Sequence, residues 1–316
     1  MAWVEGSRPP TLTWRRSNMR PGVLAASDAL FTRLQRSRPF FLFAGPNVVE
    51  STERCVRLAG AIRDVADRLG LTFVFKASFD KANRTSGCSY RGPGLDGGLH
   101  ALRAVRERIG VPVLSDVHEP AQAALAAEVV DVLQIPAFLC RQTDLLAAAA
   151  GTGRIVHIKK GQWCGPATMA AAADKVRAAG NPRVIVCERG TAFGYNDQLV
   201  DPRSLVWLRE AGGLVTADVT HALQLPGCRV DAAGDVCAGG HRELIPAIAR
   251  TAAAVGVDGL FMEIHDDPLA SPCDAPTQWP LRHLPELLGE LCDIAHASRG
   301  REPAADLNLT PMNWRH

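Results

Sequence analysis

The chain has 316 residues, of which 47% are hydrophobic and 22% are charged, and its formal net charge is +2. This composition is typical of a globular protein. So small a charge argues against nucleic acid as a partner, because binding a phosphate backbone requires an excess of cations. No apolar run is long enough to cross a bilayer, so we expect no membrane partner. The nine cysteines include no CxxC pair, which predicts reduced thiols and a cytoplasmic location.

The first 39 residues differ in composition from the rest of the chain. They contain seven arginines but only two acidic residues, a bias that is typical of an organelle transit segment. A disordered extension and a true start at Met19 are the alternatives. We expect Asp28–Arg36 to form a short helix before Pro39. The chain then divides into an N-terminal extension (residues 1–39), a folded domain (residues 40–299) and a C-terminal tail (residues 300–316).

From Phe40 onward, apolar runs that favour β-strands alternate with stretches of helical spacing. Eight such units predict a single (β/α)8 TIM barrel, and a doubly wound open sheet is the alternative, although no GxGxxG follows the first strand. The predicted strands are Phe40–Ala44, Leu71–Phe75, Val111–Leu114, Val129–Leu133, Arg154–Ile158, Arg183–Cys187, Leu214–Ala217 and Gly259–Met262. The predicted helices are Ser51–Leu69, Leu95–Ile109, Pro120–Ala127, Gln142–Ala150, Pro166–Ala179, Pro202–Ala211, His241–Val255 and Leu284–Ala297.

A polar residue follows every predicted strand. In a barrel these strand ends share one rim, which is where barrel enzymes carry their sites. The stretch FKASFDKANRTS adds further cations after the second strand, and cations gathered at one rim repel each other unless they bind a ligand with several anionic groups. A solvated surface loop is the alternative for any one of them. The strand-end residues are Asn47, Lys76, Asp116, Gln134, Lys159 with Lys160, Arg189, His221 and Glu263, and the added cations are Lys81 and Arg84.

The motifs along this barrel resemble those of the 3-deoxy-D-manno-octulosonate 8-phosphate synthase family, and of its plant-type members in particular. The resemblance covers residues 40–299 and implies a TIM-barrel enzyme that condenses phosphoenolpyruvate with D-arabinose 5-phosphate and water, releasing phosphate. The sugar acid it makes feeds lipopolysaccharide or plant cell-wall pectin. The motifs, in order, are FKASFDKANRTS, SYRGPG, SDVHE, QIPAFLCRQTDLL, IKKGQW, CERGTAFGYN, DVTHALQ and FMEIHDDP.

The resemblance also implies roles for individual residues. Asn83 stands where the related seven-carbon synthases have proline, which points to the five-carbon acceptor. Arg141 matches an arginine that reaches the neighbouring subunit's site, which implies a homo-oligomer, most simply a tetramer. The phosphoenolpyruvate positions are Lys76, Ser78, Lys81, Gln134, Lys159, Arg189 and His221, and the aldose phosphate positions are Asn83, Arg84 and Thr85. The residues expected to take part in catalysis are Asn47, Lys81, Asn83, Asp116 and His221.

One branch of this family binds a metal ion, and the ligand positions bear on whether this chain does. His221, Glu263 and Asp274 match three of those ligands, but the fourth, a cysteine there, is Asn47 here. An amide is a poor ligand for zinc or iron compared with a thiolate, so we expect no metal cofactor. Weak divalent binding by the remaining three residues is the alternative. Ala275 replaces a common glycine, which makes Asp274 the least secure of these assignments.

Two other functions are compatible with the sequence. One is a different phosphoenolpyruvate aldol synthase, and the other is a non-catalytic sugar phosphate sensor on the same barrel. The sensor is disfavoured because it has no need for the whole set of catalytic positions. The sequence GDVCAGG at residues 234–240 is expected to be a flexible loop at the rim.

Overall fold

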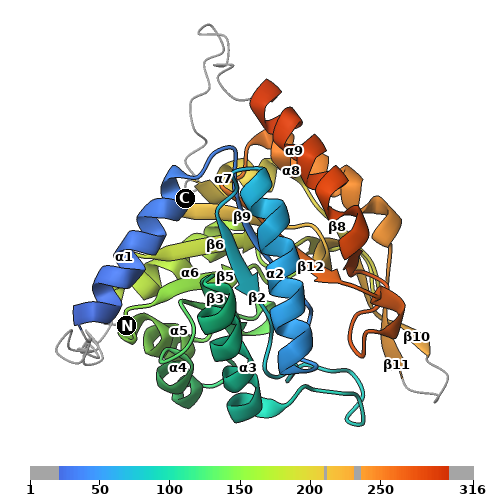
Figure 1. Cartoon of the computed structure of the whole chain (residues 1–316). Helices are drawn as coiled ribbons and strands as arrows, with labels where there is room; N and C mark the ends of the chain where they lie inside the picture. Colours follow the sequence, from blue (N-terminus) through green and yellow to red (C-terminus); the bar gives the residue numbers. More distant parts are fainter. Residues whose placement is uncertain (1–20, 210–211, 231–235, 299–316) are drawn as a thin grey trace, which may run out of the picture.

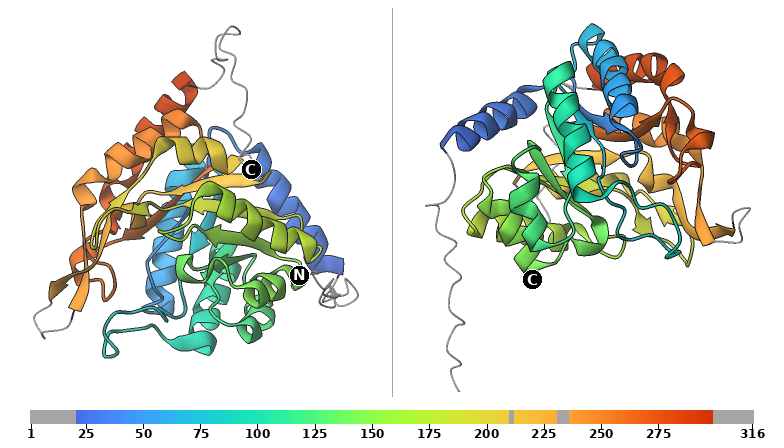
Figure 2. Two further views of the ribbon diagram at one scale, coloured as in Figure 1. Left: turned by 180° about the vertical axis from the view of Figure 1, so that it is seen from behind. Right: turned by 60° about the horizontal axis from the view of Figure 1, so that its bottom comes forward.

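The computed structural model describes residues 21–209, 212–230 and 236–298, and these form a parallel β-barrel surrounded by helices (Figures 1 and 2). The first eight strands of a nine-stranded sheet close the barrel, because β1 pairs in parallel with β12 as well as with β2. This confirms the predicted TIM barrel and excludes the open sheet. The barrel strands are β1 (Phe41–Gly45), β2 (Phe73–Lys76), β3 (Val113–Asp116), β4 (Val132–Ile135), β5 (Ile155–Lys159), β6 (Val184–Glu188), β9 (Leu214–Asp218) and β12 (Gly259–His265).

Each barrel strand is followed by a helix on the outer face. Ser51 accepts a hydrogen bond from the backbone of Arg54 and caps the first of these helices, while Gly110 and Gly256 end two others in the left-handed conformation. The helices are α2 (Thr52–Arg68), α3 (Gly94–Ile109), α4 (Pro120–Ala126), α5 (Thr143–Gly151), α6 (Pro166–Ala178), α7 (Pro202–Arg209), α8 (Ile245–Val255) and α9 (Leu284–Ser298).

Some predicted helix boundaries were wrong. The stretch before α8 begins as a 3₁₀ turn, Arg242–Leu244, so the α-helix starts at Ile245 and not at His241. The last two residues predicted for α7 lie outside the described part of the chain. The N-terminal helix α1 spans Pro21–Arg36 and is longer than the predicted Asp28–Arg36.

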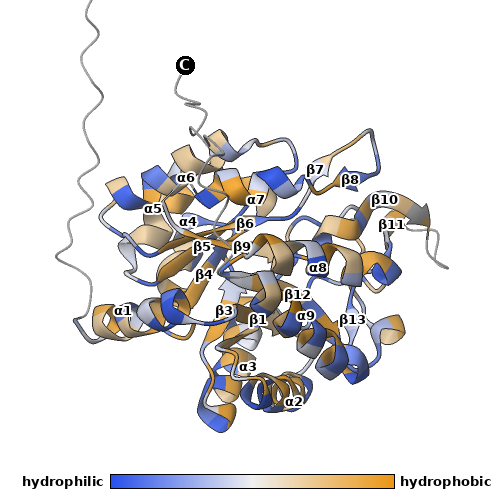
Figure 3. Ribbon diagram, turned by 90° about the horizontal axis from the view of Figure 1, so that it is seen from above, coloured by the Kyte–Doolittle hydropathy of each residue, from blue (hydrophilic) through white to orange (hydrophobic). Residues whose placement is uncertain are grey.

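The barrel interior and the helix layer have separate apolar cores. Alternation along β1 points Phe41 and Phe43 into the barrel and Leu42 toward the helices, as expected for period-2 side chains. Leu30 and Leu34 of α1 join the inner core, so α1 covers the end of the barrel where the strands begin (Figure 3). This end is closed, which leaves the opposite rim for a ligand.

Two hairpins extend the barrel rim. The first, β7 (Thr191–Ala192) with β8 (Gln198–Leu199), follows β6, and the second, β10 (Gln224–Val230) with β11 (Val236–Gly240), follows β9. The prediction of a flexible loop at residues 234–240 was therefore wrong for residues 236–240, because cross-strand pairing with β10 orders them. Residues 234 and 235 lie outside the described ranges. A short strand β13 (Trp279–Pro280) pairs with the end of β12. Among the described residues, no helix combines the length and apolar character needed to cross a membrane.

Candidate active site

A cavity of about 150 Å³ opens at the carboxyl ends of the barrel strands. Side chains that the sequence predicted from distant motifs meet there, including all five cations of the predicted cluster. The arrangement matches the expected location of a barrel active site. The cations that line the cavity are Lys76, Lys81, Arg84, Lys159 and Arg189, and the other predicted residues that line it are Asn83, Thr85, Asp116, Gln134, His221 and Asp274.

Five predicted residues do not line this cavity. Lys160 is buried, and its ammonium donates to the carbonyl of Gly190 (2.9 Å). Asn47 and Glu263 are fully buried beside it. Ser78 is also fully buried, and its hydroxyl donates a 2.5 Å hydrogen bond to Asp116. Ser78 therefore positions a cavity residue in this structure and does not itself face the ligand space. Arg141 is exposed, just before α5.

Most of the cations are paired, which corrects the expectation that they stand uncompensated. Four of the five have a carboxylate partner, and such pairing offsets part of the cost of removing a charge from water. In and beside the cavity, five cations face the four carboxylates of Asp116, Asp218, Glu263 and Asp274, which leaves one net positive charge. The ion pairs are Lys76–Glu263 (2.6 Å), Lys81–Glu263 (3.7 Å), Arg84–Asp274 (3.4 Å) and Lys159–Asp218.

Sequence reasoning missed Asp218, which the structure places at the centre of the site. It ends β9, is almost fully buried, and accepts hydrogen bonds from Lys159 and from Nδ1 of His221 (2.7 Å). The ammonium of Lys159 also lies 3.3 Å from the ring centroid of Phe261, a cation–π contact. The signal was present, because Asp218 directly follows the predicted strand Leu214–Ala217.

Arg189 is the exception among the cavity cations. Its guanidinium donates to the side-chain oxygens of Gln198 (2.5 Å) and Gln224 (3.4 Å), both uncharged. It forms no ion pair with any carboxylate in the described ranges. Burial lowers the pKa of Arg189, with Asp218 opposing this, and a guanidinium nevertheless stays protonated at neutral pH. Its charge is therefore available to an anionic ligand.

The buried acids of the site are held in their charged forms. Burial acts to raise the pKa of Glu263, but attraction to His221, Lys76 and Lys81 outweighs it and lowers the pKa to about 2. The pKa of Asp116 is lowered in the same way, burial being opposed chiefly by Lys81 and Lys76. Burial also lowers the pKa of Lys76, with Glu263 opposing it. The carboxylates and lysines therefore sustain each other's charges.

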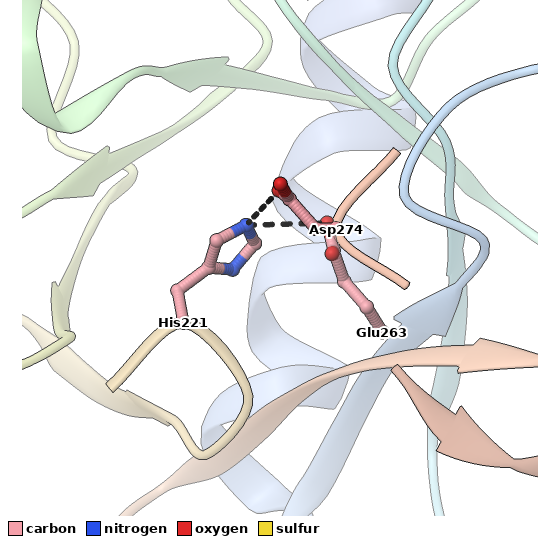
Figure 4. Close-up of side chains that lie close together, drawn as sticks. All are labelled: His221, Glu263 and Asp274. Carbon is pink, nitrogen blue, oxygen red and sulfur yellow. Dashed lines mark ion pairs between the residues drawn. The ribbon is translucent and has the colours of Figure 1, made fainter. Parts of the chain in front are cut away.

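The side chains of His221, Glu263 and Asp274 point toward one another (Figure 4), and His221 and Asp274 line the cavity. Their potential ligand atoms all lie within 4.8 Å of one another, with Nε2 of His221 3.5 Å from Glu263 and 3.9 Å from Asp274. Nδ1 of His221 lies 2.7 Å from Asp218, so a neutral ring at this position would have its proton on Nδ1 and its lone pair on Nε2. These three residues come from η3 (His221–Leu223), β12 and the loop before β13.

The side chain of Asn47 takes the place that a metal ion would need. Its Nδ2 donates one hydrogen bond to Glu263 and another, of 2.9 Å, to Asp274, so an amide group bridges the two carboxylates. The reversed amide would set its oxygen against both acids and repel them. A transition metal at this point would have only three good protein ligands and would break both hydrogen bonds of the Asn47 amide. The residues present therefore do not fit a zinc or iron site.

A hydrogen-bonded chain runs from the cavity into the barrel interior. Gln134 donates to Asp116 through its amide nitrogen, and its oxygen is 2.8 Å from Nδ1 of His157. The other ring nitrogen of His157 is 2.8 Å from the hydroxyl of Thr216. Burial, followed by the nearby Lys159, holds the pKa of His157 well below its ordinary value, so the ring is neutral. The position of His157 beneath Gln134 makes it structural support for the cavity wall.

Residues 34–296 match the family described as DAHP synthetase I. The chain is 57% identical over 288 residues to 2-dehydro-3-deoxyphosphooctonate aldolase 1 of Arabidopsis thaliana, covering 91% of this chain and 99% of that protein. The chain belongs to the 2-dehydro-3-deoxyphosphooctonate aldolase family. This family is the 3-deoxy-D-manno-octulosonate 8-phosphate synthase family under its other name, so the resemblance seen in the sequence motifs is confirmed.

Other members of the aldolase family show the same coverage. The Pisum sativum 2-dehydro-3-deoxyphosphooctonate aldolase is 56% identical over 294 residues, which span 93% of this chain and 99% of that protein. The bacterial aldolase of Acidithiobacillus ferrooxidans is 50% identical over 264 residues, 84% of this chain and 92% of that protein. The likeness therefore extends over most of the chain.

Proposed function

We propose that this chain condenses phosphoenolpyruvate with D-arabinose 5-phosphate and water, giving 3-deoxy-D-manno-octulosonate 8-phosphate and inorganic phosphate. The observation that carries the proposal is the convergence of five cations on one cavity, with Arg189 free of a carboxylate partner in the described part of the chain. Phosphoenolpyruvate carries a phosphate and a carboxylate, and a guanidinium binds either group through paired hydrogen bonds. The names of the relatives supply the reaction, and the charges of the cavity suit its substrates.

Arg189 and Lys159 are the proposed phosphate side of the phosphoenolpyruvate site. Lys159 ends β5, Arg189 directly follows the neighbouring strand β6, and both line the cavity. Lys76 at the end of β2, Lys81 in the loop after it and Gln134 in β4 complete the site. Preorganised cations of this kind stabilise the charge that develops as phosphate leaves with cleavage of its C–O bond.

Arg84, Asn83 and Thr85 are the proposed site for the aldose phosphate. All three line the cavity on the loop that follows β2, and Nε of Arg84 is buried without a hydrogen-bond partner among the described residues. A phosphate oxygen would satisfy that nitrogen. The aldehyde end of the sugar then points toward Lys81, which can donate to its oxygen as carbon 3 of the enol attacks.

His221 is the proposed proton acceptor for the water that adds at carbon 2. Its Nε2 lone pair is free because Nδ1 donates to Asp218. Asp116, the other candidate from the sequence, already accepts hydrogen bonds from Ser78 and Gln134 and has a strongly lowered pKa, which makes it a weak base. Asn47 acts as a positioning residue through the two carboxylates that it bridges, and no metal ion is needed.

A homo-oligomer with shared active sites is also proposed. Arg141 is exposed in the segment between β4 and α5 that also holds Phe138, and the Phe138 ring stacks on Trp163 with 6.0 Å between ring centroids while the two remain 47% and 57% exposed. Exposed stacked aromatic side chains are typical of protein interfaces. We expect the same face of a second copy to cover them and to receive Arg141 at its cavity, within a tetramer that acts in the cytoplasm.

The test is a phosphate release assay with purified protein. Phosphate should form only when phosphoenolpyruvate and D-arabinose 5-phosphate are both present, and EDTA should not reduce the rate. Arg189→Ala should abolish release, whereas Arg250→Ala, which removes an exposed arginine on α8, should not. Faster release with the four-carbon aldose phosphate would assign a different synthase. Binding of both substrates without any phosphate release would assign a sensor.

A further inference from the structure

Gln198, on the β7–β8 hairpin, makes three side-chain hydrogen bonds at the rim that neither the sequence motifs nor the proposed mechanism accounts for. Its side-chain oxygen accepts a 2.5 Å hydrogen bond from Nη1 of Arg189. Its side-chain nitrogen donates to two backbone carbonyls, those of His221 (3.2 Å) and Gln224 (2.7 Å). A single amide group therefore joins the cation of one rim segment to the backbone of the next.

The local backbone brings this amide into place. Gly190 adopts a φ of +89° directly after Arg189, and a Cβ atom there would lie 3.3 Å from both Cβ and the side-chain oxygen of Gln198. The left-handed turn and the missing side chain let the hairpin fold back onto the guanidinium. Ala192 N donates to the carbonyl of Gln162 (2.9 Å), which fixes the hairpin from its other side.

The uncharged amide of Gln198 distinguishes Arg189 from the other cations of the cavity, which are paired with carboxylates. Lys76, Lys81, Arg84 and Lys159 each have a carboxylate partner, whereas Arg189 is held by the oxygens of two glutamines. An amide oxygen orients a guanidinium without neutralising it. The two N–H groups of the Gln198 amide also occupy the carbonyls of His221 and Gln224, so its oxygen can only point toward Arg189.

We propose that Gln198 is a positioning residue that sets the orientation of Arg189 and preserves its free charge for the phosphate of phosphoenolpyruvate. The inference rests on the proposed function for the identity of that ligand. A carboxylate at this position would pair with Arg189, compete with phosphate and be repelled by the two carbonyls. An apolar side chain would leave the guanidinium free to turn toward the acidic groups nearby.

The experiment compares Gln198→Glu with Gln198→Leu. Affinity for phosphoenolpyruvate and for inorganic phosphate is measured by calorimetry, and kcat and KM by phosphate release. Because hydrogen bonds to charged groups are the ones affected, Gln198→Glu should raise the Kd for phosphoenolpyruvate roughly 10- to 100-fold and Gln198→Leu by about threefold to tenfold. Affinity for arabinose 5-phosphate should be unchanged in both. Asn196→Asp, the same amide-to-acid change on the exposed tip of this hairpin, should change nothing.

A purely structural role gives a different result. Both variants lose the two hydrogen bonds to backbone carbonyls, so their thermal midpoints should fall by similar amounts. Equal losses of affinity for phosphoenolpyruvate and for arabinose 5-phosphate would overturn the proposal. Should Gln198→Glu not fold, Gln198→Leu still decides, because loss of affinity for both ligands contradicts it. Failure of the proposed function is seen separately, as wild-type protein that releases no phosphate. Binding of inorganic phosphate then still measures the effect of Gln198 on Arg189.

Discussion

Replacement of Asn47 by cysteine tests whether the Asn47 amide, by bridging Glu263 and Asp274, takes the place of a metal ion. The amide of Asn47 donates to the ionised side chains of both Glu263 and Asp274, and hydrogen bonds to charged groups contribute about 1.5–3 kcal/mol each. A thiol keeps neither bond, so Asn47→Cys should lose about 3 kcal/mol or more in the presence of chelator. In a domain of this size that corresponds to a fall of roughly 6–12 °C in the thermal midpoint.

The same substitution should create a metal site. A thiolate joins His221, Glu263 and Asp274, whose ligand atoms already lie within 4.8 Å of one another, to give four ligands suited to zinc. Zinc at one hundred times its Kd would restore about 2.7 kcal/mol, so the variant's midpoint should rise by several degrees when metal is added. Its phosphate release should stop after exhaustive chelation and return with metal, while the wild type is indifferent to both.

The assay is differential scanning fluorimetry and phosphate release, each with EDTA and with added zinc. Asn47→Ala is the matched control, because it loses the same hydrogen bonds but offers no ligand, and its midpoint should stay low in zinc. The reasoning is refuted if the wild type loses activity on chelation and regains it with metal. It is refuted equally if Asn47→Ala and Asn47→Cys respond to zinc in the same way.

Three further outcomes follow from particular contacts. Gly259→Ala should destabilise the barrel by several kcal/mol because its Cβ would lie 2.2 Å from the Phe41 ring, whereas Gly289→Ala, with open space around it in α9, should be neutral or stabilising by about 0.5–1 kcal/mol in urea unfolding. The pKa of Glu263, lowered from 4.5 to about 2, predicts stability that is present above pH 4.5 and is lost as the pH falls toward 2; a urea midpoint that stays constant from pH 6 to pH 3 would contradict this. Arg141→Ala should raise the KM for arabinose 5-phosphate about tenfold and leave that for phosphoenolpyruvate unchanged, if its guanidinium serves a neighbouring site; equal changes in steady-state kinetics would argue against sharing.

The barrel could be predicted because its signals are local. Each strand is a short apolar run between turn residues, and its polar end follows from where the chain leaves the core, as for Lys76 at the end of β2 and Lys159 at the end of β5. Convergence of these side chains required only the closure rule for parallel strands. The predicted strands accordingly lie within a few residues of the observed ones.

The pairing inside the site could not be predicted, because it depends on contacts between distant residues. Lys159 and Asp218 are 59 positions apart, and Asn47 and Glu263 are 216 apart. Nothing in the sequence around Lys159 says that a buried acid lies beneath it. The β11 strand was missed for a related reason, since its glycine-rich sequence favours a loop and only pairing with β10 makes it a strand.

The distribution of carboxylates explains how a cavity with five cations can fold before its ligands arrive. Were all five unpaired, repulsion and desolvation would oppose folding by many kcal/mol. Buried acids beneath Lys76 and Lys159 remove most of that cost and hold both ammonium groups in fixed positions. Among the residues that the structure describes, no acid pairs with Arg189, which is held by amides at the rim. Binding an anionic substrate would therefore need little rearrangement of the protein, and the favourable electrostatic energy is concentrated at the group proposed to bind the phosphate.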